Sequence, residues 1–268
     1  MFELSERDKK DFEEDGYIIV RGLFEDEEIG LLKDQAKNDK DLDNNSFTSK
    51  DDEGGKIRLA LWNYPGNDIY GRFVRCRRMV DTMEALLGDE VYHYHSKMIL
   101  KGPKVGGAWD WHQDYGYWYD ISVLFPDLAS VMVAVDKANK ENGCLQVLKG
   151  SHKMGRINHG VNEEQMGADM ERVNQAMEVL ERVYVELEPG DALFFHSNLL
   201  HRSDQNHSDN PRWAMISCYN TKHNTPYKKT RHASYTPLEI IEDSELKMTP
   251  EAPVIQSGDW MKGLDKIS

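Results

Sequence analysis

The feature that most constrains this chain is a series of short, strand-like runs that begins after Gly88. Each run is rich in Val, Ile, Tyr or Phe, and Gly, Pro, Asn or Asp residues separate the runs. β-Branched and aromatic residues favour extended backbone, whereas Gly, Pro, Asn and Asp favour turns. The runs are VYHYHSKMIL, SVMVAVD, GCLQVL, VYVEL, ALFFHSNLLH and RWAMISCYN. At least six short strands with turns between them predict a sandwich or a barrel.

The segments around these runs predict a single domain over residues 1–268, with no internal repeat. Residues 1–88 are expected to be mostly helical, because Ser5 is a plausible N-cap and Gly88 ends a helical pattern over 70–87. The other expected parts are a strand at 17–20, a one-faced helix from Glu25, a polar loop at 38–56, a β-rich body at 89–222 with a helical insert at 162–182, and a C-terminal extension at 223–268. The acidic run within 51–53 is interpreted as a solvated loop, with a lid over a site as the alternative.

Composition excludes several classes of function. With 33 basic and 47 acidic side chains, the formal net charge is −14, which disfavours a nucleic-acid partner. We find no apolar run near the roughly 20 residues that a membrane span needs, and the start MFELSERDKK does not resemble a signal peptide. The three cysteines, Cys76, Cys144 and Cys218, are far apart and form no CxxC pair, as expected for reduced thiols. We therefore expect a cytoplasmic, globular protein.

The stretch WDWHQDYGYW contains a His-x-Asp triplet, His112 and Asp114, among aromatic rings. Side chains at positions i and i+2 of a strand lie on the same face, so these two groups can approach one metal ion. His201, 201 − 114 = 87 residues further on, is the candidate third ligand. Two histidines and one carboxylate form the facial triad of non-haem Fe(II) oxygenases, although zinc also accepts such a set. The HExxH motif of hydrolytic zinc enzymes is absent.

Ser203 and Arg212, which both follow His201 in the sequence, indicate a receptor for a carboxylate. Ser203 is at i+2 from His201, and Arg212 follows a turn-rich octet, DQNHSDNP, at the start of the next expected strand. A guanidinium group beside a hydroxyl group, both near a metal, suits a carboxylate. 2-Oxoglutarate, which chelates a metal at one end and carries a carboxylate at the other, fits this arrangement.

Several motifs resemble those of the phytanoyl-CoA dioxygenase family of Fe(II)/2-oxoglutarate oxygenases. They are EDGYIIVRGLF, WHQD, ENGCLQVLKGSH, LEPGDALFFH and LLHRSDQN with PRW, and together they cover most of the chain. GGAWDWHQDYGYW and HSNLLHRS are most similar to the ectoine hydroxylase branch.

The resemblance implies a mainly β fold with flanking helices, the double-stranded β-helix (a cupin-like jelly roll). It also implies that His112, Asp114 and His201 bind Fe(II), while Arg212 and Ser203 bind the distal carboxylate of 2-oxoglutarate. It further implies that Lys97, Gln113 and Met132 line the co-substrate pocket and that Arg58 is a basic residue contributed by the N-terminal region. Met132 departs from the family pattern, because relatives often have Trp there.

The aromatic residues near the triplet are open to two interpretations. Trp111, Tyr117 and Trp118 are either core residues or part of a substrate pocket. Trp118 is the best substrate-contacting candidate, because ectoine hydroxylase-like sequences have such a Trp at this position.

We therefore expect an Fe(II)- and 2-oxoglutarate-dependent dioxygenase. It would use dioxygen to hydroxylate an unactivated C–H bond of a small polar metabolite, with release of succinate and carbon dioxide. Because Asp114 fills the position that chloride takes in related halogenases, hydroxylation is expected over halogenation. A non-catalytic cupin-like binding protein, a metal-dependent isomerase or hydrolase, and a hydroxylase of an acyl-CoA substrate remain open alternatives.

Overall fold

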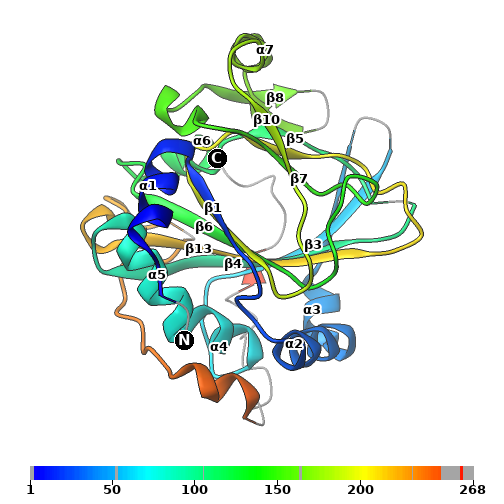
Figure 1. Ribbon diagram of the computed structural model, residues 1–268, viewed down its shortest axis with the longest axis vertical. Helices are drawn as coiled ribbons and strands as arrows, with labels where there is room; N and C mark the ends of the chain where they lie inside the picture. Colours follow the sequence, from blue (N-terminus) through cyan, green and yellow to red (C-terminus); the bar gives the residue numbers. More distant parts are fainter. Residues whose placement is uncertain are drawn as a thin grey trace.

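Two antiparallel sheets form the body of the protein, and they face each other (Figure 1). The computed structural model describes residues 3–51, 54–104, 106–162, 165–230, 232–248 and 260–261. The larger sheet has the order β1-β11-β6-β13-β4-β3-β14, with β2 beside β3, and the smaller has the order β10-β7-β12-β5. The larger sheet contains β1 (Tyr17–Val20), β2 (Phe47–Lys50), β3 (Lys56–Trp62), β4 (Val91–Lys101), β6 (Leu128–Ala134), β11 (Ala192–His196), β13 (Arg212–Thr221) and β14 (Trp260–Met261). The smaller contains β5 (Trp109–His112), β7 (Leu145–Leu148), β10 (Arg182–Val185) and β12 (His201–Ser203). This confirms the jelly roll with flanking helices.

Strand β6 shows why the central runs are apolar at every position. Val131 and Val133 pack in the cluster that joins the larger sheet to the helices, whereas Met132 and Ala134 pack in the cluster between the two sheets. Because successive side chains of a strand point to opposite faces, a strand covered on both faces must be apolar throughout.

Helices from the first third of the chain cover the outer face of the larger sheet (Figure 1). The helices are α1 (Glu6–Asp15), α2 (Asp26–Asn38), α3 (Lys40–Asn45), α4 (Ile69–Arg75) and α5 (Arg77–Leu87). Ser5 caps α1 in a capping box with Asp8, and Gly16 ends it with a φ of 83°. The predicted N-cap is confirmed. These helices leave the inner face of the larger sheet free to form a cavity with the smaller sheet.

Three expected segments differ from the structure. The polar stretch 38–56 is not a loop: Asp39 caps α3 by accepting from two backbone amides, and Leu42 is buried, so a short helix and strand β2 form there. The helix expected over 70–87 is two helices that meet at Cys76, whose backbone is extended. The insert expected as a helix over 162–182 is a hairpin of β8 (His159–Asn162) and β9 (Gln165–Ala168), then the shorter helix α7 (Met170–Met177).

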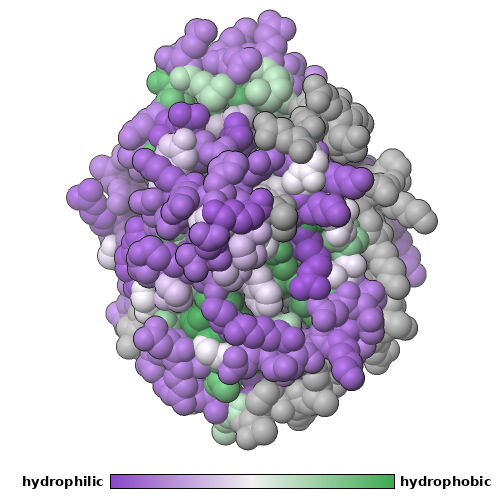
Figure 2. Space-filling view, turned by 90° about the vertical axis from the view of Figure 1, so that its right-hand side faces the viewer, coloured by the Kyte–Doolittle hydropathy of each residue, from purple (hydrophilic) through white to green (hydrophobic). Residues whose placement is uncertain are grey.

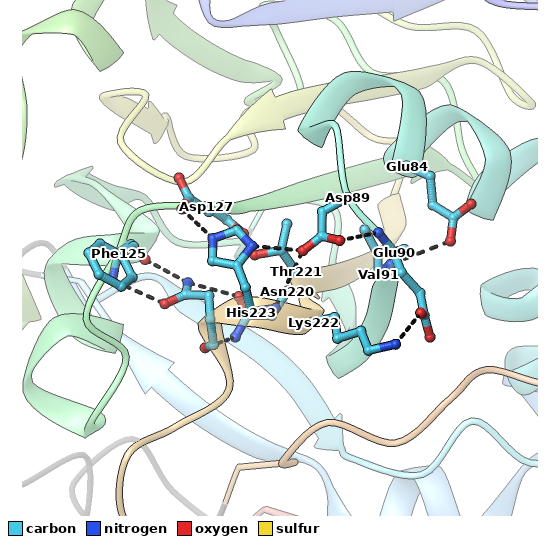
Figure 3. A network of polar contacts seen from close by, with 11 residues as sticks. Glu84, Asp89, Glu90, Val91, Phe125, Asp127, Asn220, Thr221, Lys222 and His223 are labelled. Atoms are coloured by element: carbon cyan, nitrogen blue, oxygen red, sulfur yellow. Dashed lines mark hydrogen bonds and ion pairs between the residues drawn. The ribbon is translucent and has the colours of Figure 1, made fainter.

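A polar network anchors the chain where β13 ends and the C-terminal segment begins (Figure 3). His223 lies between two carboxylates, with its Nδ1 2.7 Å from Asp89 and its Nε2 2.9 Å from Asp127. Lys222 donates to Glu90 at 2.7 Å. These contacts join the segment to the loops before β4 and β6 and so fix its path across this end of the sheets.

Short 3-10 helices and polar side chains complete the surface. The 3-10 helices are Tyr119–Ile121, Ser151–Met154, Lys222–Asn224 and Asp243–Lys247, and α6 (Asp114–Trp118) is a short α-helix. The face in Figure 2 is mainly hydrophilic, with a small apolar patch at its upper end and further apolar atoms visible between polar residues lower down. Within the described ranges, no helix has the length and apolar character needed to cross a membrane.

Candidate metal and co-substrate site

The predicted triad comes together at one edge of the smaller sheet. His112 on β5 and His201 on β12 are directly opposite each other in the antiparallel register. The Oδ1 atom of Asp114 is 4.0 Å from His112 Nε2 and 3.9 Å from His201 Nε2. Asp114 does not continue the strand as expected, because β5 ends at His112 and Asp114 begins α6. The turn into this helix, rather than strand alternation, directs the carboxylate toward the two histidines.

Hydrogen bonds prepare all three groups as ligands. His112 Nδ1 donates to the carbonyl oxygen of Asp110 at 2.7 Å, and His201 Nδ1 donates to that of Leu199 at 2.9 Å. Each Nε2 lone pair is thereby left for a metal ion. Burial lowers the pKa of both imidazoles, which keeps them neutral. Asp114 Oδ2 accepts a hydrogen bond from Ser130 at 2.8 Å, so Oδ1 is the oxygen that faces the histidines.

The spacing of these atoms fits a metal ion. The three ligand atoms lie within 4.8 Å of one another, and all three residues are buried. With two separations near 4 Å and the third no longer than 4.8 Å, a point exists roughly 2.1–2.5 Å from all three atoms, close to the bonds of about 2.1 Å that imidazole and carboxylate form with such metals. In the described part of the chain, this is the sole group of three His, Cys, Asp or Glu residues with such spacing.

The triad borders a cavity of about 520 Å³ between the sheets. Four alternate residues of β4, His95, Lys97, Ile99 and Lys101, line it because side chains two apart on a strand share a face. Other lining residues include Phe47, Trp109, Tyr117, Trp118, Met132, Phe195, Ser203, Arg212 and His232. The cavity therefore combines apolar and aromatic walls with a few cationic groups.

Arg212 is a buried cation that faces this cavity. It is 3% exposed, and burial lowers its pKa to about 10. No ion pair of Arg212 is formed within the described residues, and its Nε has no hydrogen-bond partner there. An unpaired buried charge is costly, so this group requires an anion. Ser203, which lines the same cavity, is a further polar partner for that anion.

Most of the predicted pocket residues reach the cavity: Lys97, Met132, Ser203, Arg212, Tyr117 and Trp118 all line it. Trp118 lies edge-on to His95, with ring centroids 5.6 Å apart. The ring of Tyr117 is 5.5 Å from that of His112.

Three predicted residues do not line the cavity. The buried amide of Gln113 is engaged by backbone groups, since it donates to Gly155 and Asn198 and accepts from Ile157. Arg58 pairs with Asp43 at 2.7 Å on the surface, because its strand neighbours at 57 and 59 take the inward positions. Trp111 alternates with His112 on β5 and packs in a separate apolar cluster.

The lining residues that sequence reasoning missed include two basic side chains, Lys101 and His232. Lys101 shares a strand face with Lys97, so alternation along β4 would have revealed it. His232 comes from the C-terminal segment and stacks on Tyr94 with ring centroids 4.8 Å apart. No sequence pattern signals that contact, because it depends on the path of the segment.

The jelly roll, the triad and the buried arginine define a 2-oxoglutarate-dependent non-haem iron dioxygenase. Residues 12–214 match the phytanoyl-CoA dioxygenase family, and the chain belongs to that family. When bound, the iron supplies the activation of dioxygen, coupled to decarboxylation of 2-oxoglutarate.

Relatives of known activity span most of the chain. L-proline trans-4-hydroxylase of Streptomyces griseoviridis is 29% identical over 220 residues, which cover 76% of this chain and 79% of that protein. Ectoine dioxygenase of Stutzerimonas stutzeri is 26% identical over 227 residues, covering 78% and 74%. The fold is similar to that of the crystal structure of EctD from S. alaskensis with 2-oxoglutarate and 5-hydroxyectoine, with a TM-score of 0.74, 23% identity and coverage of 89% and 88%.

Proposed function

We propose that the protein hydroxylates a small, amino-acid-like carboxylate, with 2-oxoglutarate and dioxygen as co-substrates and succinate and carbon dioxide as co-products. In this proposal His112, Asp114 and His201 hold the iron, and Arg212 with Ser203 holds the distal carboxylate of 2-oxoglutarate. Hydroxylation is the proposed outcome because the Asp114 carboxylate occupies the ligand position that a halide would need.

The observation that carries the substrate class is the cation Lys97. It lines the cavity between His95 and Ile99 and forms no ion pair or hydrogen bond within the described residues. Its charge lowers the pKa of both His112 and His201, which indicates that it lies near the metal ligands. Because Arg212 serves the co-substrate, we assign Lys97 to a carboxylate of the substrate.

The cavity supports a compact substrate. A volume of about 520 Å³ must hold 2-oxoglutarate as well as the substrate. Tyr117 and Trp118 are proposed as the wall that excludes water from the reacting C–H bond. The relatives named for proline and ectoine act on small molecules of this kind. The net charge of −14 favours such a substrate over nucleic acid, and three buried free cysteines support a cytoplasmic location.

The test is substrate-stimulated release of succinate with Fe(II), 2-oxoglutarate and a panel of amino acids, cyclic zwitterions and acyl-CoA esters. Zwitterionic carboxylates should stimulate the release of succinate. The hydroxylated product should gain one oxygen atom from labelled dioxygen, even when chloride is present. Lys97→Met should raise the KM for the substrate while leaving uncoupled turnover of 2-oxoglutarate close to wild type. Stimulation by acyl-CoA esters alone would refute the substrate class.

A matched pair of histidine variants tests the reaction class. His201→Ala should abolish succinate release, whereas His207→Ala, an exposed histidine six residues further on, should not. Absence of 2-oxoglutarate turnover in the wild-type protein with every substrate tested would favour a non-catalytic binding protein.

A further inference from the structure

Three polar side chains lie side by side across the central strands of the larger sheet. Cys218 on β13 is directly opposite Ser130 on β6 and directly opposite His95 on β4. Directly opposite residues of antiparallel strands place their side chains on the same face of the sheet. That face is the inner one, because His95 lines the cavity and Cys218 packs between the two sheets. All three residues are buried, so their polar atoms depend on one another for hydrogen bonds.

These side chains form a polar chain that connects a metal ligand to the wall of the cavity. Ser130 Oγ donates to Asp114 Oδ2 at 2.8 Å and lies 3.2 Å from Cys218 Sγ. Cys218 Sγ lies 3.4 Å from His95 Nε2. At the cavity end, the ring of His95 lies edge-on to that of Trp118. A substrate bound against Trp118 would therefore lie beside the last member of the polar chain.

The number of hydrogens available decides the direction of these bonds. Ser130 donates its hydroxyl hydrogen to Asp114, so its oxygen can only accept from Cys218. The thiol of Cys218 keeps its hydrogen, because burial raises its pKa to about 12. A thiol that donated to His95 would leave the contact between Ser130 and Cys218 without a hydrogen. Both contacts are hydrogen bonds only if Cys218 donates to Ser130 and His95 Nε2 donates to Cys218.

We propose that Cys218 is a positioning residue that couples the substrate side of the cavity to the metal ligand Asp114. It holds His95 in the form that carries hydrogen on Nε2, and it transmits a change at His95 through Ser130 to the carboxylate. Every donor in the polar chain then points toward Asp114, an arrangement in which each hydrogen bond strengthens the next. This inference goes beyond the proposed function and rests on it only in taking the wall at Trp118 as the substrate side.

Nitrogen NMR on protein with isotopically labelled histidine tests the direction of the bonds. An imidazole nitrogen that carries hydrogen resonates far upfield of one that does not, and His95→Gln identifies the signals of His95. Nε2 should carry hydrogen in the metal-free wild-type protein. Zn(II), a diamagnetic ion that accepts two histidines and a carboxylate, should shift this signal when it binds Asp114. In Cys218→Ala the hydrogen should no longer be held on Nε2, and the response to Zn(II) should be lost.

A conservative variant and a matched control separate positioning from packing. Cys218→Ser keeps one donor and one acceptor, so it should restore both the wild-type signal and its response to Zn(II). Cys76→Ala removes another buried thiol, which packs among the outer helices and donates to the carbonyl oxygen of Phe73, and it should behave as wild type does. If Cys218→Ala does not fold, Cys218→Val replaces it, because valine fills a similar volume and donates no hydrogen.

A double-mutant cycle on Zn(II) affinity tests whether Cys218 acts through Ser130. In competition with a chelator, Cys218→Ala should bind Zn(II) about 2- to 10-fold more weakly than wild type, the effect of losing one neutral hydrogen bond. In the Ser130→Ala background the same substitution should cause no further loss, because the polar chain is already broken there.

Each result bears on a different claim. A His95 Nε2 without hydrogen in the wild-type protein, an unchanged signal and affinity in Cys218→Ala, or an undiminished loss in the Ser130→Ala background would each overturn the role of Cys218. Absence of 2-oxoglutarate turnover in the wild-type protein would overturn the proposed function instead, and the position of the hydrogen on His95 would still decide the direction of the polar chain.

Discussion

Removal of the Ser130 hydroxyl group should weaken metal binding without altering the fold. Ser130 is fully buried on β6, and its Oγ donates to Asp114 Oδ2 at 2.8 Å. The same Oγ is 3.2 Å from Cys218 Sγ, which lies 3.4 Å from His95 Nε2, so Ser130 is the first member of a polar chain that begins at the metal ligand. In Ser130→Ala, the carboxylate loses the contact that directs its other oxygen toward the two histidines.

The expected magnitude follows from the charge of the acceptor. A buried hydrogen bond to a charged group contributes about 1.5–3 kcal/mol. Loss of a partner that orients a metal ligand typically reduces metal affinity roughly 10- to 100-fold, which is consistent with that energy. We therefore expect Fe(II) or Mn(II) to bind Ser130→Ala about 10- to 100-fold more weakly than wild type.

Competition titration with a chelator of known affinity provides the assay, and circular dichroism confirms the fold. The matched control is Ser217→Ala on the neighbouring strand β13. Its hydroxyl group is buried as well and accepts from Ser96, and within the described residues it makes no hydrogen bond to the triad side chains. An affinity of Ser130→Ala equal to that of the control would refute the reasoning, because Asp114 would then be oriented by its helix alone.

Three further changes test other parts of the structure. Arg212→Ala should raise the KM for 2-oxoglutarate by roughly 30-fold or more, measured by succinate release, with metal affinity unchanged. An unchanged KM would mean that another cation binds the distal carboxylate of 2-oxoglutarate. Gln113→Ala should lower the free energy of unfolding by about 3 kcal/mol or more, because three backbone groups lose their hydrogen-bond partner. Urea denaturation measures this loss, and the affinity for 2-oxoglutarate should persist. A loss of affinity for 2-oxoglutarate without a loss of stability would contradict this assignment of Gln113. Hydrogen bonds to Asp89 and Asp127 raise the pKa of His223 above 6.5, so its contribution to stability is complete below that pH and is lost as pH rises through the raised value. Since this site is half exposed, His223→Gln should cost no more than roughly 1 kcal/mol at about pH 5.5, and the difference in Tm from wild type should vanish near pH 9; a constant difference would exclude the charge as its source.

The residues that form the metal site could be predicted from the sequence more completely than the local structure around them. The grouping of His112, Asp114 and His201 could be predicted, because few residues in the sequence combine metal-binding chemistry with a suitable spacing. Gln113 was misplaced because a resemblance between motifs does not show which way a side chain points. Its amide has buried backbone partners, and those depend on the turns near 155 and 198.

Local patterns were least informative where tertiary contacts decide the structure. The polar stretch 38–56 has a composition typical of a loop, yet burial of Leu42 and pairing with β3 organise it. The break at Cys76 is equally unmarked by sequence, since residues on both sides favour helix. Its position coincides with a bridge to Ile241, which lies 165 residues further on. Such contacts cannot be read from a window of neighbouring residues.

The pairing of the two histidines has a consequence for how the cell handles this protein. They lie 201 − 112 = 89 residues apart in the chain, on β12 and on β5, the edge strand of the smaller sheet. A metal ion bound by both histidines closes a long loop and stabilises the edge strand β5 against local unfolding. Metal binding and folding are therefore thermodynamically linked. At a free metal concentration one hundred times the Kd, this linkage adds about 2.7 kcal/mol to stability. Iron scarcity would then reduce the amount of the protein as well as its activity, because the metal-free chain opens more often and is degraded faster.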